Sequence, residues 1–146
     1  MAASLLDNAS YAAPRRSAVA TTSRAALWTS RVITGIVALL LAMDAGMKLI
    51  QAKPAIEGSA QLGFAPASVF VIGVIAAVCL VLYLIPRTAP LGAILWTGYF
   101  GGAVVTHLRA GNPLFTHILS GVYVSTLIWI SLYLRDARVR ALVGKR

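Results

Sequence analysis

The sequence predicts an all-α protein, a four-helix transmembrane bundle whose N-terminus and C-terminus both lie in the cytoplasm. Three observations predict it: an apolar composition, four long apolar runs, and an uneven distribution of basic residues. Of the 146 residues, 59% are hydrophobic and only 12% are charged, whereas soluble domains are about 45–50% apolar and about 25% charged. A chain this short has too little interior to hide so much apolar surface from water. The lipid bilayer is therefore the first partner that the sequence indicates.

The chain divides into a tail, residues 1–30, and a four-span membrane domain, residues 31–146. The tail is basic and rich in Ala, Ser and Thr. We expect a flexible cytoplasmic segment, and we regard it as a candidate contact for other membrane protein subunits. A transit peptide has a similar composition, so a targeting role is the alternative.

Four apolar runs are long enough to cross a membrane. The hydrocarbon core is about 30 Å thick and requires about 20 residues of α-helix. The expected spans are residues 32–50, 67–85, 91–108 and 116–134. No run alternates between polar and apolar residues as the strands of a membrane barrel would. The spans are therefore expected to be helices.

The basic residues predict the orientation. With the N-terminus inside, only Lys48, Lys53 and Arg109 of the 13 Lys and Arg residues lie toward the outer side. Loops that stay in the cytoplasm carry an excess of Lys and Arg, so we expect both termini inside, in the inner membrane of a bacterium. Because the basic residues flank apolar runs instead of covering a folded surface, nucleic-acid binding is not indicated.

Asp44 and Lys48 form a charged pair inside the first span. They are one helical turn apart and share a face. Asp44 lies about 18 Å along the helix from Val32 at 1.5 Å per residue, within the outer half of the hydrocarbon region. A carboxylate there costs on the order of 2.5–3.5 kcal/mol and usually faces the bundle interior. The pair is either part of a functional site or a structural ion pair in which Lys48 neutralises Asp44.

A second polar cluster surrounds the loop between the third and fourth spans. It contains both histidines of the chain and consists of His107, Arg109, Asn112 and His117. Gly111-Asn112-Pro113 is a turn signal, which brings His107 close to His117. With the predicted orientation, this loop lies on the same side as Asp44 and Lys48, together with Gln51 and Glu57. We therefore expect these residues to converge at the outer end of the bundle and to bind a ligand there.

Several chemistries fit this cluster. A His and an acid can exchange protons with a quinone head group, because His titrates near neutrality. Arg109 can hold a small oxyanion. Two His and an acid can bind a metal, but no spacing supports it, and no metal ligand is assigned. The alternative without a ligand is a cap of polar residues whose hydrogen bonds satisfy the unpaired backbone groups at the helix ends. No arrangement indicates nucleophilic catalysis, so no catalytic residue is assigned.

Small and aromatic residues predict packing. Ala42 with Gly46, and Gly98 with Gly102, are pairs four residues apart that allow helices to approach closely within the bundle. Aromatic residues near span ends, where rings prefer the headgroup level, are Trp28, Tyr83 and Trp96. Cys79 is the only cysteine, which excludes an intramolecular disulfide.

A run of small, aromatic and polar residues forms a recognisable motif. The run 97–109 reads Thr-Gly-Tyr-Phe-Gly-Gly-Ala-Val-Val-Thr-His-Leu-Arg, followed by Gly-Asn-Pro-Leu-Phe and, later, Tyr-Leu-Arg-Asp at 133–136. Together with the segment from Asp44 to Lys48, this pattern resembles the DoxX-like family, and the resemblance covers roughly residues 32–142. It implies a four-helix membrane bundle. The family's namesake is similar to a small subunit of a thiosulfate:quinone oxidoreductase, and other relatives are associated with membrane redox or sulfur-stress complexes.

Two functions follow from these observations. The favoured hypothesis is a non-catalytic accessory or structural subunit of a larger membrane complex, because the chain has no ligand set that could hold a redox centre alone. The alternative is the membrane subunit of a quinone-linked sulfur or thiol oxidoreductase, with a quinone or proton site formed by Asp44, Lys48, His107 and His117. The cofactor is unassigned, and quinone is the candidate. Four spans leave little room for a solute carrier.

Overall fold

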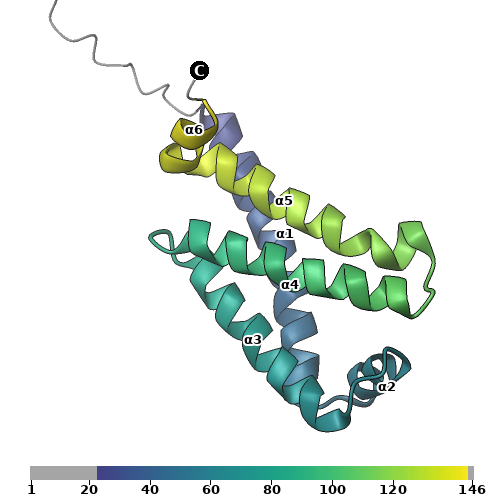
Figure 1. The fold of residues 1–146 in the computed structure, drawn as a ribbon. Helices are drawn as coiled ribbons and strands as arrows, with labels where there is room; N and C mark the ends of the chain where they lie inside the picture. Colours follow the sequence, from purple (N-terminus) through teal and green to yellow (C-terminus); the bar gives the residue numbers. More distant parts are fainter. Residues whose placement is uncertain (1–22, 145–146) are drawn as a thin grey trace, which may run out of the picture.

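The computed structural model describes residues 23–144. They form helices and contain no strand (Figure 1). The elements in chain order are α1 (Arg24–Leu49), α2 (Lys53–Gln61), α3 (Pro66–Leu84), α4 (Ala89–Arg109), the π-helix η1 (Leu114–Ile118), α5 (Ser120–Arg135) and α6 (Ala137–Val143). The segments Arg24–Leu49, Pro66–Leu84, Ala89–Arg109 and Leu114–Arg135 are long and apolar enough to cross a membrane. The prediction of an all-α, four-helix membrane bundle is thus confirmed.

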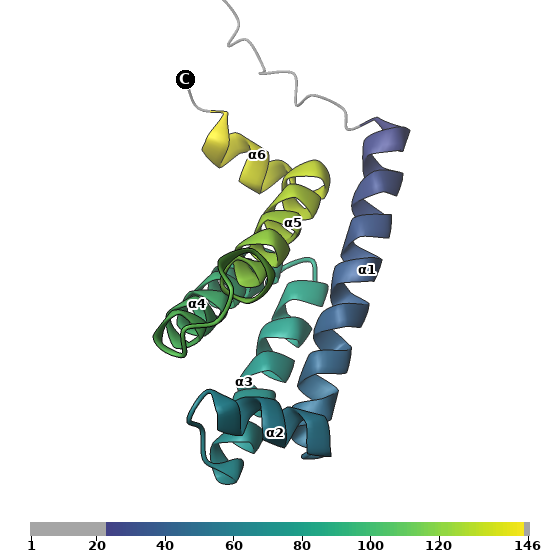
Figure 2. The same cartoon turned by 90° about the vertical axis from the view of Figure 1, so that its right-hand side faces the viewer.

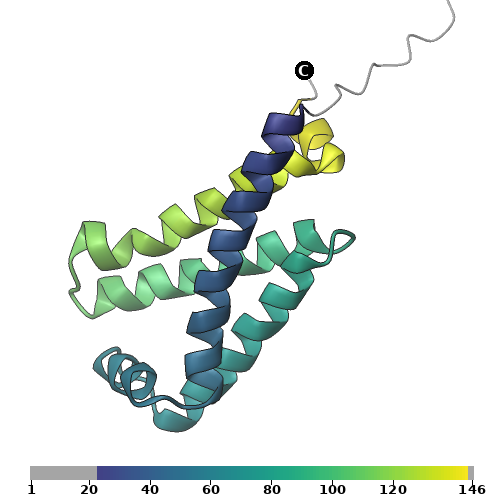
Figure 3. The ribbon, with the colours of Figure 1, turned by 180° about the vertical axis from the view of Figure 1, so that it is seen from behind.

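The four long helices pack as a ring. α1 contacts α3 and α5, and α4 also contacts α3 and α5. α1 and α4 therefore face each other diagonally. Figure 2 shows α4 and α5 side by side as a hairpin, with α1 standing apart from α4. Figures 1 and 3 show that this hairpin and the α1–α3 pair diverge toward the ends that carry η1 and α2.

Local signals explain where the helices begin. The Ser23 side chain accepts a hydrogen bond from the Ala26 amide at 3.1 Å and caps α1, as hydroxyl side chains do at helix N-termini. A proline stands in the first turn of α2, α3 and α4, where its missing N–H needs no intrahelical partner.

α1 is longer than the expected first span. It begins at Arg24 and not at residue 32, so residues 24–30, which we had assigned to the tail, belong to the helix. Hydropathy did not indicate this extension because the added turns contain polar residues. One of them, Ser30, is fully buried. The tail residues 1–22, including the expected partner contact, lie outside the described residues.

Three short elements were not expected from the sequence. α2 lies between the first two spans, and α6 follows α5 at the C-terminal end. The Asp136 carboxylate caps α6 by accepting a hydrogen bond from the Arg138 amide at 2.8 Å. η1 precedes α5 and forms the first turn of the fourth span. Because these segments are short, their apolar residues give weak periodicity.

A buried hydroxyl cluster joins α1, α3 and α5. Ser30 donates to the Ser131 carbonyl at 2.7 Å, and Thr34 donates to the Ser131 hydroxyl at 3.2 Å. The hydroxyls of Tyr83 and Ser131 are 2.6 Å apart. All four residues are buried. Hydrogen bonds between helices hold membrane bundles together because lipid gives the helices little apolar driving force to associate.

The glycines that bring helices together are not the predicted ones. A Cβ atom added to Gly98 or Gly102 would meet nothing within 4 Å, and the same holds for Gly46. In contrast, a Cβ on Gly92 would lie 2.3 Å from the Tyr83 amide nitrogen. A Cβ on Gly73 would lie 2.9 Å from the Lys48 Cβ. The predicted close contact of helices through Gly98 and Gly102 is therefore wrong: both residues are exposed, and Gly102 borders a cavity instead of a neighbouring helix.

Two of the three predicted headgroup aromatics are core residues. Trp28 is 65% exposed, whereas Trp96 and Tyr83 are 0% exposed. Trp96 packs edge-on against Tyr99 and stacks on Phe100, with ring centroids 5.0 and 5.2 Å apart. The headgroup prediction is wrong for Trp96 and Tyr83, because position along a span does not determine the direction in which a side chain points.

Candidate functional site

A cavity of about 500 Å³ lies where the α4–α5 hairpin diverges from the α1–α3 pair. Four predicted site residues line it: Asp44, Lys48, His107 and His117. Asp44 and Lys48 come from α1, His107 from the end of α4, and His117 from η1. The fold therefore brings together polar groups from three separate elements.

Lys48 contacts two other polar residues that line the cavity, Asp44 and Tyr99. Its ammonium forms an ion pair with the Asp44 carboxylate one turn earlier on α1. It also donates a hydrogen bond to the Tyr99 hydroxyl at 3.2 Å and lies 5.9 Å from the Tyr99 ring centroid. The Lys48 side chain is 17% exposed and the Asp44 side chain 44%. The carboxylate is therefore the more accessible partner, and the ammonium is the buried link between α1 and α4.

Tyr99 is the site residue that sequence reasoning missed. It lies in the middle of α4 and lines the same cavity. Its ring packs edge-on against Trp96 and Phe100, at 5.0 and 5.6 Å, which fixes the direction of the hydroxyl. The signal in the sequence was the position of this tyrosine, far from either end of a span. A phenol buried there needs a hydrogen-bond partner, which points to a polar group nearby.

The two histidines lie together at the other end of the cavity. Their ring centroids are 5.8 Å apart. Nδ2 of Asn112 lies 2.8 Å from Nδ1 of His107, a geometry in which the amide donates and the ring nitrogen accepts. The Thr116 hydroxyl lies 2.8 Å from Nδ1 of His117. Each ring is thus held through Nδ1, so both Nε2 atoms remain for a ligand or a proton.

The turn between α4 and η1 explains this pairing. Gly111 has φ +68°, a left-handed conformation that glycine adopts without steric cost. The Asn112 amide N–H returns to the His107 carbonyl at 3.1 Å. Pro113 then precedes η1, whose π-helical turn contains His117. This short connection places the two rings next to each other.

Arg109 and Asn112 do not line the cavity. Arg109 is exposed, and its Nη2 donates to the Leu62 carbonyl at 3.1 Å. Leu62 itself lines the cavity, so Arg109 joins the end of α4 to the α2–α3 connection at the rim. Asn112 acts through its contact with His107.

Gln51 and Glu57 stay apart from the cluster. Gln51 Nε2 approaches the Pro66 carbonyl at 3.5 Å. Glu57 forms an exposed pair with Lys53 at 4.0 Å on α2. Neither lines the cavity, so these two residues do not join the other polar groups at its wall.

The rest of the cavity wall is apolar. Leu40, Leu41, Ile72, Ile75, Val104 and Val124 contribute to it. An ammonium, a phenol and two imidazoles at such a wall suit an amphipathic ligand with hydrogen-bond acceptors on a compact head group. Among residues 23–144, no group of three or more His, Cys, Asp and Glu lies close enough to hold a metal ion. The Cys79 thiol is buried on α3, outside the cavity lining.

Comparison with known proteins identifies a family. The sequence model of the DoxX-like family matches residues 32–131, which include α3, α4 and every predicted site residue. No curated protein and no solved structure matches the chain.

Proposed function

This chain belongs to the DoxX-like family of integral membrane proteins, and on that premise we propose that it is the quinone-binding membrane subunit of an oxidoreductase complex. The complex would oxidise a sulfur compound or a thiol. The observation that carries the proposal is the shared cavity of Asp44, Lys48, His107 and His117, closed by Tyr99. The structure therefore favours the second of the two hypotheses from the sequence.

The cavity fits a quinone head group. Head-group carbonyls accept hydrogen bonds, and the Lys48 ammonium and Tyr99 hydroxyl are donors at the wall. The apolar side chains around them suit the ring and the start of an isoprenoid tail. A volume of about 500 Å³ lies within the range of about 300–1,000 Å³ that is typical of small-molecule sites.

On this proposal the side chains of the cavity have two roles: some bind the head group, and others exchange protons with it. When bound, a quinone supplies an acceptor for two electrons and two protons. The Nε2 atoms of His107 and His117 are not used in the contacts of these rings with Asn112 and Thr116, so each ring can exchange a hydrogen-bonded proton with the head group. Asp44 orients Lys48 and compensates its charge.

The electrons would come from a partner subunit. Cys79 is the only cysteine of the chain, so a dithiol–disulfide pair cannot form within it. On this proposal the chain supplies the quinone site in the membrane, and another subunit binds and oxidises the substrate.

A structural role is the second candidate, and one observation favours it. Most polar groups of the cavity already have partners within the protein: Lys48 pairs with Asp44 and Tyr99, which also line the cavity, and His107 pairs with Asn112 beside it. Such pairing satisfies polar groups within a membrane protein without any ligand. On this reading the chain is a non-catalytic accessory subunit.

Mass spectrometry of the protein purified from its native membrane in mild detergent separates the two candidates. We expect a bound quinone together with partner subunits. Asp44→Asn and His107→Ala should lose the quinone and keep the partners. Glu57→Gln is the matched control, because it neutralises an exposed carboxylate outside the cavity. Partner subunits without quinone in the wild type, or full quinone occupancy in both site variants, would establish the accessory role.

A further inference from the structure

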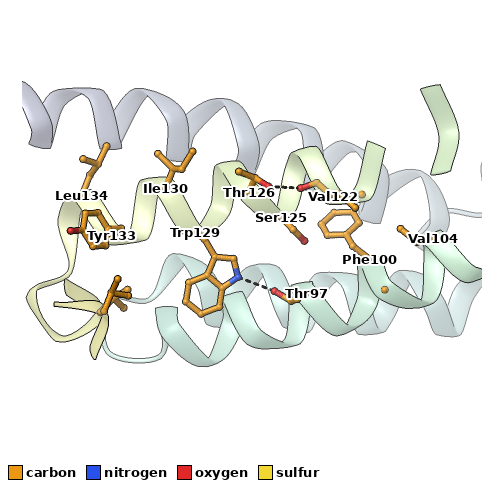
Figure 4. A pocket seen from close by; sticks show the side chains of 14 residues that line it. Thr97, Phe100, Val104, Val122, Ser125, Thr126, Trp129, Ile130, Tyr133 and Leu134 are labelled. Atoms are coloured by element: carbon orange, nitrogen blue, oxygen red, sulfur yellow. Dashed lines mark hydrogen bonds between the residues drawn. The ribbon is translucent and has the colours of Figure 1, made fainter. Parts of the chain in front are cut away.

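A second cavity of about 650 Å³ lies between α4 and α5 and extends to α6. All of its lining residues come from these three helices (Figure 4). We call it the α4–α5 groove. The residues of the groove used below are Thr97, Phe100, Gly101, Trp129, Tyr133 and Leu134. Its lining differs from that of the candidate quinone cavity, because it contains no Asp, Glu, Lys, Arg or His.

Three polar side chains of the groove, Thr97, Thr126 and Trp129, are already hydrogen-bonded. Trp129 reaches from α5 to the Thr97 hydroxyl, with Nε1 and Oγ1 3.0 Å apart (Figure 4). Thr97 in turn donates to the Ala93 carbonyl at 2.9 Å, and Thr126 donates to the Val122 carbonyl at 2.8 Å. With these groups paired, the groove presents a largely apolar surface on helices that are long and apolar enough to cross the membrane, which matches an acyl chain.

The α6 end of the groove carries a guanidinium group. Nη1 of Arg140 donates to the carbonyls of Tyr133 at 3.2 Å and Leu134 at 2.9 Å, and both of these residues line the groove. Within residues 23–144, the side-chain hydrogen bonds of Arg140 all use Nη1, so Nε and Nη2 can donate to another acceptor. Val139 and Val143, on either side of Arg140 along α6, also line the groove.

The surroundings of this end are basic. Residues 135–144 contain three Arg residues and one acid, Asp136. That acid is paired with Arg138 at 2.8 Å. Arg138 also donates to the carbonyl of Pro86 at 2.8 Å, which holds α6 against the α3–α4 connection. The end of the groove thus combines an apolar channel with an excess of positive charge.

We propose that the α4–α5 groove binds one anionic phospholipid, with an acyl chain along the groove and the phosphate at Arg140. A guanidinium binds phosphate through parallel hydrogen bonds, and basic pockets between membrane helices bind anionic head groups. The positive charge at the α6 end favours a lipid over a partner helix. An apolar helix could fill the groove, but it would offer no anionic group to the Arg140 guanidinium.

The test uses the full chain in nanodiscs of phosphatidylcholine with a minor fraction of phosphatidylglycerol. Native mass spectrometry after mild delipidation measures the ratio of the two lipids that stay bound. We expect the wild type to retain phosphatidylglycerol selectively. Arg140→Gln should lower that selectivity about fivefold, because one basic residue near an anionic surface contributes on the order of 1 kcal/mol. Arg140→Lys should keep most of it.

Two glycines of α4 provide a matched pair that does not depend on α6. A Cβ on either Gly101 or Gly98 meets no atom within 4 Å, but only Gly101 lines the groove. Gly101→Leu should therefore fill the groove and abolish lipid retention, while Gly98→Leu should behave as wild type. Equal retention of both lipids by the wild type, or unchanged retention by Gly101→Leu, would overturn the proposal. A dimer that is present in the wild type and lost in Gly101→Leu would assign the groove to a second copy of the chain instead.

Discussion

Lys48 of α1 and Tyr99 of α4 join the two helices that face each other diagonally across the bundle, through a hydrogen bond of 3.2 Å between Nζ and the phenol oxygen. α1 otherwise packs on α3 and α5. Lys48 and Tyr99 both line the candidate quinone cavity. The Lys48 ammonium also forms an ion pair with the Asp44 carboxylate. Both the stability of the bundle and the binding of a head group should depend on the hydrogen bond between Lys48 and Tyr99.

Removing the Tyr99 hydroxyl should weaken quinone binding. Tyr99→Phe keeps the ring packing on Trp96 and Phe100 but removes a donor from the cavity. We expect quinone occupancy to fall about tenfold and stability to fall by about 1 kcal/mol, the usual contribution of one hydrogen bond. Quinone extraction and thermal denaturation in detergent measure the two effects. Tyr123→Phe, at an exposed tyrosine of α5, is the control, and an equal loss in both variants would contradict the role of Tyr99.

Removing Lys48 should cost more than removing the ion pair as a whole. Lys48→Met leaves the Asp44 carboxylate without its partner, which costs about 3–5 kcal/mol in a fully buried pair. Asp44 is 44% exposed, so we expect about 2 kcal/mol. The double variant Asp44→Asn, Lys48→Met should recover part of this loss. Thermal denaturation of the single and double variants tests it, and strictly additive losses would argue against coupling between the two side chains.

Gly92 should tolerate no larger residue. The Cβ of Gly92→Ala would lie 2.3 Å from the Tyr83 amide nitrogen, so α3 and α4 would have to move apart. Overpacking of this kind typically costs about 1–3 kcal/mol. Gly98→Ala is the matched control in the same helix, since nothing lies within 4 Å of its added methyl group. It should be neutral or slightly stabilising. Equal melting temperatures for the two variants would show that the close approach of α3 and α4 is not required.

The docking of α6 should weaken at low pH. The Arg138 side chain, which hydrogen-bonds the Asp136 carboxylate, lowers the pKa of Asp136 below its usual value of 3.8. A carboxyl whose pKa is lower in the folded state contributes stability above its unfolded pKa and loses it as the pH falls through the folded pKa. Hydrogen exchange of α6 amides, corrected for intrinsic rates, should therefore rise below about pH 3.8. Asp136→Asn should show raised exchange already at neutral pH, and a wild-type profile without this rise would contradict the prediction.

The predicted orientation, with both termini in the cytoplasm, has a direct test. In a background lacking Cys79, a cysteine replacing Glu57 on α2 should react with a membrane-impermeant maleimide in intact cells. A cysteine replacing Leu142 on α6 should react only after permeabilisation. Both positions are exposed, so accessibility to the protein surface is matched. The reverse pattern would place the candidate quinone cavity at the cytoplasmic end.

The candidate site was only partly predictable. Asp44 and Lys48 stood out because charges within an apolar run are costly, and the Gly111 turn indicated that His107 and His117 would be close. Tyr99 escaped notice because a tyrosine in an apolar helix resembles any other packing residue. Arg109 was expected among the ligands, but its long side chain reaches the Leu62 carbonyl at the rim. The direction of a flexible side chain depends on acceptors supplied by other elements.

The bundle of four membrane-spanning helices could be predicted from local patterns, because length and apolarity are sums over neighbouring residues and require no knowledge of the fold. The same patterns placed the charged pair and the two histidines at the same end. The contacts between helix faces could be known only from the folded chain. The contact of Gly92 with Tyr83, the burial of Trp96 and the hydrogen bond from Lys48 to Tyr99 all depend on the rotation and crossing of whole helices. Those are set by packing between residues far apart in the chain, which no local pattern records.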